Sequence, residues 1–450
     1  MTIRIDRPIQ GGTVRAIASK SEAHRLLICA ALADRECFIA CPERSEDIDA
    51  TVRCLEAMGA VLRYESGGFL VTPVPALRSP VSNSCSPVKM DCGESGATLR
   101  FLLPVCGALG LAVSFNMSGR LPERPLSALC GEMTAHGCTL SGPDNRDKRS
   151  GSEPGYSLLN CKGRLKSGIY TLPGNISSQF VSGLLFALPL LLEESIIRVT
   201  GVLESRPYVD MTLEALRLFG ITVFEEEAQV FRIPGGQIGS SPANAKVSGD
   251  WSNAAFWLSA GAIGKGKTFE KTGVTCTGLN PDSRQGDRAI IKLLELFGAC
   301  VTRKHNEVTV SPGILCGTDI DAGDTPDLVP IIAAVASVAE GKTSIRNAGR
   351  LRIKESNRLH TIAMSLTDLG ADIRETEDGL IITGKKALPG GETQSYGDHR
   401  IAMTAAVLSA VCTGPVLIQD AGAVRKSYPG FFEDFCALGG VCIPVDSSIS

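Results

Sequence analysis

Six segments of this 450-residue chain share one pattern, in which an apolar, helix-like stretch ends at a glycine and continues into a strand-like stretch. A glycine accepts the left-handed backbone conformation that often follows the last turn of a helix, and the β-branched residues beyond it favour a strand. Successive glycines are separated by about 70 to 80 residues, which is too long for a solenoid repeat. The six are Gly59, Gly137, Gly220, Gly298, Gly370 and Gly439.

This spacing predicts six copies of a small α+β unit, three in each of two similar domains. We place the division near residues 245–249, between the third and fourth glycines. Helix–glycine–strand junctions occur in any α/β protein, so the prediction depends on their even recurrence and not on any one of them.

Composition indicates a globular protein without a large charge excess. Hydrophobic residues make up 44% of the chain and charged residues 21%, which is ordinary for a soluble protein. The net charge of −3 argues against a general binder of nucleic acid or anionic membranes. Residues 1–6 lack a signal-peptide core, and the apolar run 180–192 is too short to span a bilayer. We therefore expect a cytoplasmic protein.

The cysteines and histidines do not suggest a metal site. The 16 cysteines include no CxxC pair, and several lie in apolar runs, which is typical of buried free thiols in a reducing compartment. The five histidines have no HExxH or similar spacing. We expect neither a disulfide framework nor a zinc site.

The densest charge cluster lies in residues 349–359, where Arg350, Arg352, Lys354, Glu355 and Arg358 fall within nine positions. If a helix begins here, Lys354 and Arg358 share one face. Glu355 could be their counter-ion or a proton-transfer group. Because charge runs are usually solvated faces, this cluster alone does not identify a site.

Similar polar or basic residues precede the other apolar segments. Each alone is explained by a helix cap or a turn. Together they favour anion binding, since the N-termini of helices attract phosphate and carboxylate groups. If these helix starts converge, they form a strongly cationic cleft in a slightly acidic protein. The residues are Lys20, Ser21, Arg25, Gly96, Arg100, Arg120, Arg124, Ser177, Ser178, Gln179, Ser205, Asp327, Asp398, Arg400 and Lys426.

Residues 261–268 match the phosphate-loop pattern GxxxxGK[ST]. That loop follows a strand and opens a helix. Here a helical pattern, Ser252–Ile263, precedes the match and a strand-like stretch follows it. We therefore interpret the match as part of the repeat and not as a nucleotide site.

The ordered motifs resemble those of the EPSP synthase (3-phosphoshikimate 1-carboxyvinyltransferase) family of enolpyruvyl transferases. The resemblance covers residues 20–429. The motifs are Lys20-Ser-x3-Arg25, Gly93-x2-Gly96-x3-Arg100, Arg120-x2-Glu-Arg124-Pro, Ser177-Ser-Gln-Phe, Pro207-Tyr-x-Asp, Pro326-Asp327, Lys354-Glu355-x2-Arg358, Asp398-His-Arg-x-Ala-Met and Lys426-Ser-Tyr-Pro.

The resemblance implies an α/β fold of two similar domains, each built from three βαβαββ units as an inside-out α/β barrel, with the active site in the interdomain cleft. One domain would comprise residues 1–18 plus 247–450, and residues 19–246 would form the inserted second domain. The implied reaction transfers the enolpyruvyl group of phosphoenolpyruvate to the 5-hydroxyl of shikimate 3-phosphate through a tetrahedral intermediate, releasing phosphate. This reaction belongs to the shikimate pathway of chorismate and aromatic amino acid biosynthesis. The resemblance implies no metal, no organic cofactor and a monomer.

Residue roles follow from the resemblance, position by position. The catalytic residues would be Asp327, which takes the hydroxyl proton, and Glu355 and Lys20, which protonate the phosphoenolpyruvate methylene. Shikimate 3-phosphate would be held by Lys20, Ser21, Arg25, Ser177, Ser178, Gln179, Ser205, Asp327 and Lys354. Phosphoenolpyruvate would be held by Lys20, Gly96, Arg120, Gln179, Arg358, Arg400 and Lys426.

The chain departs from the family at four positions, with Ala18 for glycine, Glu94 for asparagine, Arg350 for asparagine in some members, and Asn357 for aspartate. We assign no role to Arg350. Sensitivity to the family's inhibitor glyphosate is plausible because Gly96 leaves space beside the phosphoenolpyruvate site.

The sequence disfavours two alternative functions. The sister transferase that acts on UDP-N-acetylglucosamine resembles Lys-Asn in its first motif and carries a loop cysteine, whereas here Ser21 follows Lys20 and residues 120–125 contain no cysteine. A non-catalytic nucleic-acid-binding protein is disfavoured by the net charge and by the lack of interleaved aromatic residues.

Overall fold

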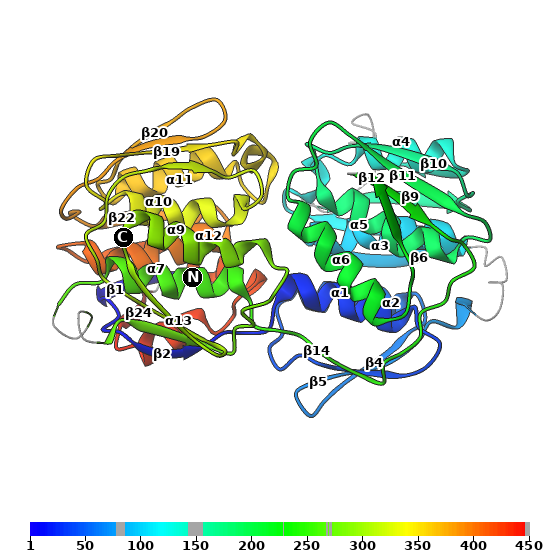
Figure 1. Cartoon of the computed structure of the whole chain (residues 1–450), viewed down its shortest axis with the longest axis horizontal. Helices are drawn as coiled ribbons and strands as arrows, with labels where there is room; N and C mark the ends of the chain where they lie inside the picture. Colours follow the sequence, from blue (N-terminus) through cyan, green and yellow to red (C-terminus); the bar gives the residue numbers. More distant parts are fainter. Residues whose placement is uncertain (78–85, 143–155, 228, 267–268, 270–271, 446–450) are drawn as a thin grey trace. The chain divides into compact units, whose positions relative to one another are not determined.

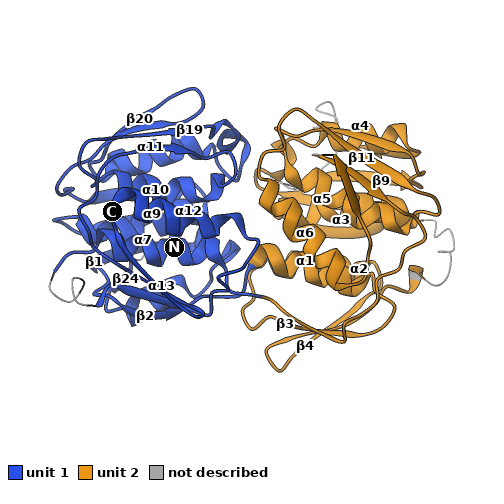
Figure 2. Cartoon of the chain, in the orientation of Figure 1, with its two compact units in different colours: residues 1–19, 248–450 blue, residues 20–247 orange. Residues whose placement is uncertain are grey.

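The computed structural model describes the chain except for residues 78–85, 143–155, 228, 267–268, 270–271 and 446–450. The described residues form two compact units (Figure 2). Unit 1 comprises residues 1–19 and 248–450, and unit 2 comprises residues 20–247. The boundaries predicted from the sequence fall one residue earlier at each crossing. The phosphate-loop match ends on Lys267 and Thr268, which lie outside the described residues.

Six four-stranded sheets share one topology, and each unit holds three of them. In every sheet the first two strands are parallel, and the other two pairings are antiparallel. The orders are β14-β3-β5-β4, β6-β7-β9-β8 and β10-β11-β13-β12 in unit 2, and β2-β15-β17-β16, β18-β19-β21-β20 and β22-β23-β1-β24 in unit 1.

The strands of unit 2 are β3 (Cys37–Ala40), β4 (Val61–Glu65), β5 (Gly68–Thr72), β6 (Val88–Gly93), β7 (Val113–Ser118), β8 (Cys138–Ser141), β9 (Tyr156–Gly163), β10 (Ile169–Pro173), β11 (Ser195–Thr200), β12 (Phe224–Glu227), β13 (Val230–Ile233) and β14 (Asn244–Lys246). Its α-helices are α1 (Lys20–Ala31), α2 (Glu46–Ala57), α3 (Gly96–Leu109), α4 (Ser127–Ala135), α5 (Ser178–Ala187) and α6 (Arg206–Leu218). Its short 3-10 turns are η1 (Pro75–Leu77), η2 (Leu121–Glu123) and η3 (Leu188–Leu190).

The strands of unit 1 are β1 (Thr2–Arg7), β2 (Gly12–Arg15), β15 (Val274–Thr277), β16 (Cys300–Lys304), β17 (Glu307–Ser311), β18 (Asp319–Asp321), β19 (Lys342–Arg346), β20 (Asp372–Glu375), β21 (Leu380–Thr383), β22 (Gly391–Gln394), β23 (Val416–Gln419) and β24 (Val441–Val445). Its α-helices are α7 (Trp251–Ile263), α9 (Ile290–Phe297), α10 (Val329–Ala336), α11 (Arg358–Asp368), α12 (His399–Leu408) and α13 (Phe431–Ala437). Its 3-10 turns are η4 (Gly286–Ala289), η5 (Pro326–Leu328), η6 (Gly349–Ile353), η7 (Ser409–Val411) and η8 (Ala421–Lys426).

The six glycine junctions predicted from the sequence are confirmed. Each glycine follows a helix and has a φ between +71° and +103°, a backbone conformation that costs other residues about 1 kcal/mol or more. The βαβαββ pattern is confirmed as well, but the sheets of the predicted barrel are separate. The described strands form six separate four-stranded sheets and do not close into a continuous barrel.

Helices lie at the centre of each unit, and the sheets lie around them (Figure 1). In unit 1, α12 is buried along its whole length, as expected for a helix that is apolar on all sides. The indole of Trp257 on α7 stacks on Phe431 at a centroid distance of 4.7 Å and donates to the Tyr428 hydroxyl at 3.1 Å. Buried helices and the aromatic contacts of α7 with Tyr428 and Phe431 therefore form part of the core of unit 1.

The chain crosses between the units twice, and the crossings complete sheets formed by distant segments. β1 and β2 join sheets of unit 1, whereas β14 joins a sheet of unit 2. The two crossing segments pair with each other, because Ser19 N–H donates to Ser248 O and Asp250 N–H donates to Ile17 O, both at 2.8 Å. Among the described residues, no helix is long and apolar enough to cross a membrane.

Candidate functional site

Most of the predicted site residues lie where helices begin, as the sequence predicts. α1 begins at Lys20, α3 at Gly96 and α5 at Ser178 in unit 2. α11 begins at Arg358, and Asp327 lies in η5 directly before α10. The N–H groups of a helix's first turn have no partner within the helix, so each of these positions offers donors to an anion.

A backbone feature that the sequence did not reveal shapes the second loop of the repeat. In five of the six sheets, the residue directly after the second strand is left-handed: Gly119, Gly201, Gly278, Asn347 and Asp420, with φ between +52° and +79°. Gly119 directly precedes Arg120, and Asn347 and Asp420 lie within two residues of the starts of η6 and η8. Only two of the five are not glycine, and asparagine and aspartate are the residues that tolerate this conformation best.

Asp327 is the centre of an ion-pair cluster in unit 1. Its Oδ1 lies 2.8 Å from Arg358 Nη1 and 3.5 Å from Lys354 Nζ. Its Oδ2 lies 3.2 Å from Arg400 Nη2, and its backbone oxygen accepts from Arg400 Nη1 at 3.0 Å. Three predicted substrate-binding cations therefore converge on one predicted catalytic carboxylate.

Arg358 is enclosed by carboxylates, with only 1% of its side chain exposed. Its Nε lies 2.7 Å from Asp398 Oδ2, and its Nη2 lies 2.7 Å from Glu355 Oε2. Asp398 is fully buried and caps α12 by accepting from Arg400 N–H at 3.0 Å. Glu355 is thus a counter-ion here, which is one of the two roles that the sequence left open.

The condition under which Lys354 and Arg358 would share a helical face is not met. Residues 349–353 form the 3-10 turn η6, and α11 begins only at Arg358. The two cations meet at Asp327 because Lys354 extends from the end of that turn. Within the same cluster, Arg352 binds Glu375 and the carbonyl oxygens of residues 376 and 377.

Opposing influences act on the pKa of Asp327. Burial raises it, but Arg400, Lys354 and Arg358 together outweigh burial and hold the pKa well below its ordinary value. Burial also lowers the pKa of Lys354, although Asp327 opposes this shift. In the structure as it stands, Asp327 is a stabilised anion and hence a weak base.

Asp287 is a buried carboxyl that sequence analysis missed. It is 1% exposed, and its Oδ2 accepts a hydrogen bond from the Ser252 hydroxyl. Its Oδ1 accepts no hydrogen bond from any residue that the structure describes. Burial, followed by the charge of Asp327, raises its pKa to about 6, against the opposing effect of Arg400. The polar Gln-Gly-Asp ahead of the apolar α9 follows the pattern of the other motifs and could have identified it.

The remaining unit 1 residues have backbone partners. Lys426 Nζ donates to Gly397 O at 2.7 Å, in the turn before Asp398. Arg350 Nη2 donates to Gly323 O at 2.6 Å, in the loop that leads to Asp327. Arg350 therefore supports this loop.

In unit 2, the first motif ties α1 to two neighbouring helices. Lys20 Nζ lies 2.8 Å from Asp47 Oδ2 on α2. Arg25 is 2% exposed, and its guanidinium donates to Thr212 Oγ1 at 2.9 Å and to Tyr208 O at 2.8 Å, both on α6. The Arg25 guanidinium thus links α1 to α6 through these two hydrogen bonds.

Two arginines lie over Gly96. A Cβ atom added to Gly96 would lie 2.6 Å from Arg100 Nη1 and 2.8 Å from Arg124 Nη1. Arg100 Nη1 also donates to Gln179 Oε1 at 3.0 Å. The predicted residues Gly96 and Gln179 therefore come together, whereas Arg120 pairs with Glu123 at 3.3 Å on the exposed turn η2.

The predicted serines lie at the starts of α5 and α6. Ser177 caps α5 by accepting from Gln179 N–H at 3.3 Å, and Ser178 is buried. Ser205 precedes α6 with φ of +54°, and its side chain makes no cap hydrogen bond. A left-handed non-glycine residue costs roughly 1–3 kcal/mol, and such residues cluster at functional sites.

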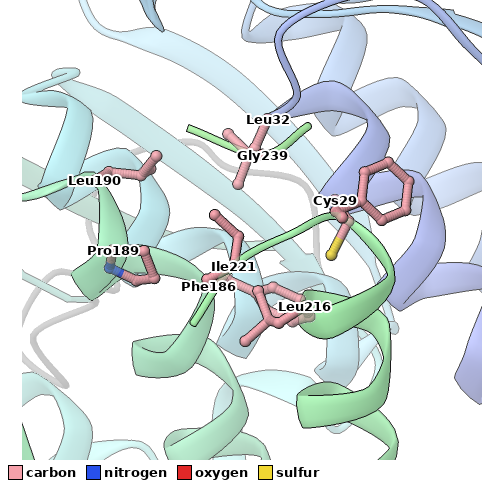
Figure 3. A pocket seen from close by; sticks show the side chains of 9 residues that line it. Cys29, Leu32, Phe186, Pro189, Leu190, Leu216, Ile221 and Gly239 are labelled. Carbon is pink, nitrogen blue, oxygen red and sulfur yellow. The ribbon is translucent and has the colours of Figure 1, made fainter. Parts of the chain in front are cut away.

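A pocket in unit 2 is of a different kind. Figure 3 shows apolar side chains from α1, α5, α6 and the segments that follow them turned toward one space. Its lining residues are Cys29, Leu32, Phe186, Pro189, Leu190, Leu216, Phe219, Ile221 and Gly239. None of these is a predicted site residue, and such a lining does not suit anionic substrates. As for metal sites, the part of the chain that the structure describes holds no group of three or more His, Cys, Asp or Glu residues arranged to bind one.

Comparison with known proteins identifies the family. Residues 4–435 match the family model described as EPSP synthase (3-phosphoshikimate 1-carboxyvinyltransferase). The chain belongs to the EPSP synthase family. The resemblance seen in the motifs is confirmed.

Curated relatives match over nearly their whole length. The chain is 42% identical to the 3-phosphoshikimate 1-carboxyvinyltransferase of Clostridium kluyveri, covering 95% of each chain, and 42% identical to that of Clostridium perfringens, covering 96% of each. The solved EPSP synthase of Acinetobacter baumannii is similar in fold, with a TM-score of 0.76, 24% identity and coverage of 98% of this chain and 100% of that one. The predicted fold class is confirmed.

Proposed function

We propose that this chain transfers the enolpyruvyl group of phosphoenolpyruvate to the 5-hydroxyl of shikimate 3-phosphate and releases phosphate. Its curated relatives are named 3-phosphoshikimate 1-carboxyvinyltransferase. The observation that carries the proposal for this chain is the cluster at Asp327, where one carboxylate meets three cations. Each substrate carries a phosphate and a carboxylate, so both need several Arg or Lys partners.

The substrate assignments follow the sequence expectation. Shikimate 3-phosphate is held by Lys20, Ser21, Arg25, Ser177, Ser178, Gln179, Ser205, Asp327 and Lys354. Phosphoenolpyruvate is held by Lys20, Gly96, Arg120, Gln179, Arg358, Arg400 and Lys426. Some of these cations bind protein carboxylates in the structure, as Lys20 binds Asp47. When a substrate anion arrives, it replaces the protein carboxylate as the partner of the cation.

Substrate binding activates Asp327 in this scheme. Lys354, Arg358 and Arg400 hold its pKa down. When a substrate phosphate or carboxylate takes over part of these cations' attraction, the anionic form of Asp327 loses stabilisation and its basicity rises. Asp327 is therefore a weak base in the free enzyme and a stronger one beside bound substrates, when the 5-hydroxyl proton must be taken.

Glu355, with Lys20, supplies the opposite proton transfer. A proton delivered to the methylene carbon of phosphoenolpyruvate makes C2 electrophilic, and the 5-hydroxyl oxygen adds to C2. Phosphate then leaves the tetrahedral intermediate and carries away the 5-hydroxyl proton that Asp327 had taken. The methyl carbon returns one proton to the group that protonated it, and the enol ether forms. Each positioned proton transfer contributes about 10²–10⁴-fold, and the surrounding cations stabilise the charge that develops on the departing phosphate.

The test follows phosphate release with phosphoenolpyruvate and either shikimate 3-phosphate or UDP-N-acetylglucosamine as the acceptor. We expect phosphate release when the acceptor is shikimate 3-phosphate, and none when it is UDP-N-acetylglucosamine. Release with only the sugar nucleotide would assign the chain to the sister reaction and overturn the proposal.

We further propose that the enzyme acts as a cytoplasmic monomer without a cofactor, bound neither to nucleic acid nor to membranes. The slightly acidic charge of −3 argues against binding to nucleic acid or anionic membranes. Light scattering coupled to gel filtration tests it, because a mass well above the 47.4 kDa of one chain would contradict the monomer.

A further inference from the structure

One pair of thiols lies in contact near the surface of unit 1. Cys436, in the last turn of α13, and Cys442, on β24, have their Sγ atoms 3.1 Å apart. Cys436 is exposed and Cys442 is half-buried. Among the described cysteines, only Cys300, Cys316 and Cys436 are exposed. Reagents in solution can therefore reach this pair, whereas the buried thiols are shielded from them.

The backbone around the pair holds the two sulfurs together. Between α13 and β24 the chain turns at Gly439, with φ of +88°, and at Gly440, where an added Cβ would lie 2.3 Å from the Phe435 ring. Cys442 is fixed on the other side by the sheet, because it lies opposite Ile5 in the antiparallel pairing of β24 with β1. The thiols are therefore kept in contact by a tight turn and a strand pairing.

We propose that Cys436 and Cys442 form a site of reversible disulfide formation that responds to low-molecular-weight disulfides. This inference is independent of the proposed enzymatic function. It differs from the disulfide framework that the sequence disfavours, because the thiols are reduced in the resting protein and form a single local bond only when oxidised.

The two thiols have different roles in the reaction. Burial, then the hydrogen bond with Cys436 and the nearby charge of Glu433, raise the pKa of Cys442 to about 12. Exposed Cys436 is the attacking group, since the thiolate is the nucleophile and access controls the rate of exchange.

The step balances as two successive exchanges. The Cys436 thiolate attacks one sulfur of the small disulfide RSSR, forming a mixed disulfide and releasing RS⁻. The Cys442 thiol then loses its proton, and its sulfur attacks Sγ of Cys436 and expels the second RS⁻. The protein loses two electrons and two protons, and RSSR becomes two RSH.

A second thiol pair provides an internal control. Cys138 and Cys161 also hydrogen-bond to each other, but they are 3% and 2% exposed. Contact without access should leave this pair reduced.

The experiment exposes the native chain of residues 1–450 to oxidised glutathione, alkylates the remaining thiols and digests with trypsin without reductant. No Lys or Arg follows Lys426, so the peptide 427–450 carries Cys436 and Cys442 and no other cysteine. We expect this peptide to be unalkylated and lighter by two hydrogens, and to recover both thiols after reduction. Its disulfide should form at least ten-fold faster than one between Cys138 and Cys161.

Two variants separate the roles. Cys442→Ser should stop at a glutathione adduct on Cys436, and Cys436→Ser should leave Cys442 unmodified. A stable glutathione adduct on Cys436 in the unmodified sequence, two alkylated thiols in the peptide 427–450, or equally fast oxidation of Cys138 and Cys161 would each overturn the proposal.

Discussion

Replacing Asp398 with asparagine tests whether the carboxylates around Arg358 are needed to keep that cation buried. Asp398 uses both oxygens as acceptors: Oδ1 binds Arg400 N–H at 3.0 Å and Arg358 Nη2 at 3.3 Å, and Oδ2 binds Arg358 Nε at 2.7 Å and Ser356 Oγ at 3.1 Å. An asparagine has only one acceptor oxygen. Asp398→Asn must therefore give up either the cap of α12 or the Arg358 pair.

The expected loss follows from burial. Removing one partner of a buried ion pair costs about 3–5 kcal/mol. Asp327 and Glu355 still neighbour Arg358 in the variant, so we expect the lower end, about 3 kcal/mol. For a folding unit of this size, that corresponds to a fall in Tm of about 6–12 °C.

Urea unfolding followed by circular dichroism, together with calorimetry, measures this loss. Glu375→Gln is the matched control, because Glu375 also pairs with an arginine, Arg352, but the two side chains are 25% and 33% exposed. We expect the control to lose less than about 1 kcal/mol. In a double-mutant cycle with Arg358→Met, a coupling of about 1.5 kcal/mol or more should appear. Equal losses for Asp398→Asn and Glu375→Gln, or no coupling, would refute the reasoning.

Three further predictions concern chemistry, pH and space. Asp327→Asn and Glu355→Gln should each lower kcat by about 10²–10⁴-fold with a much smaller change in KM, as measured by steady-state kinetics. An unchanged kcat in both variants would refute the two roles. Because the folded-state pKa of Asp287 is raised to about 6, its contribution to stability is complete below the ordinary carboxyl pKa and is lost as the pH rises through 6. Asp287→Asn should thus gain stability relative to the parent chain by about 2–3 kcal/mol between pH 4 and pH 7.5, and parallel unfolding profiles would contradict this. Gly96→Ala places a Cβ atom 2.8 Å from Arg124 Nη1, so the KM for phosphoenolpyruvate should rise at least ten-fold, and an unchanged KM would show that the arginine moves aside freely.

The local features of this fold were readable in the sequence because they depend on neighbouring residues. A glycine such as Gly298 ends its helix through its own backbone freedom, and Asp398 caps the helix that starts beside it. The six-fold repeat and the positions of the candidate site residues at helix starts followed from such local signals. The family was likewise evident from the order of short motifs.

Tertiary structure decided which charges meet. Lys354 and Arg358 converge on Asp327 through a 3-10 turn and not through a shared helical face, and Arg352, between Arg350 and Lys354 in sequence, turns to Glu375 instead. The burial of Asp287 and the contact of Cys436 with Cys442 were also invisible in the sequence. Coulomb energy, desolvation and thiol contact depend on distance and solvent exposure, which chain segments far apart in sequence set together. The sequence by itself therefore determined the repeat unit and its motifs. Only the packing of distant segments within each unit determined the protonation of the buried carboxyl groups and the contact between the two thiols.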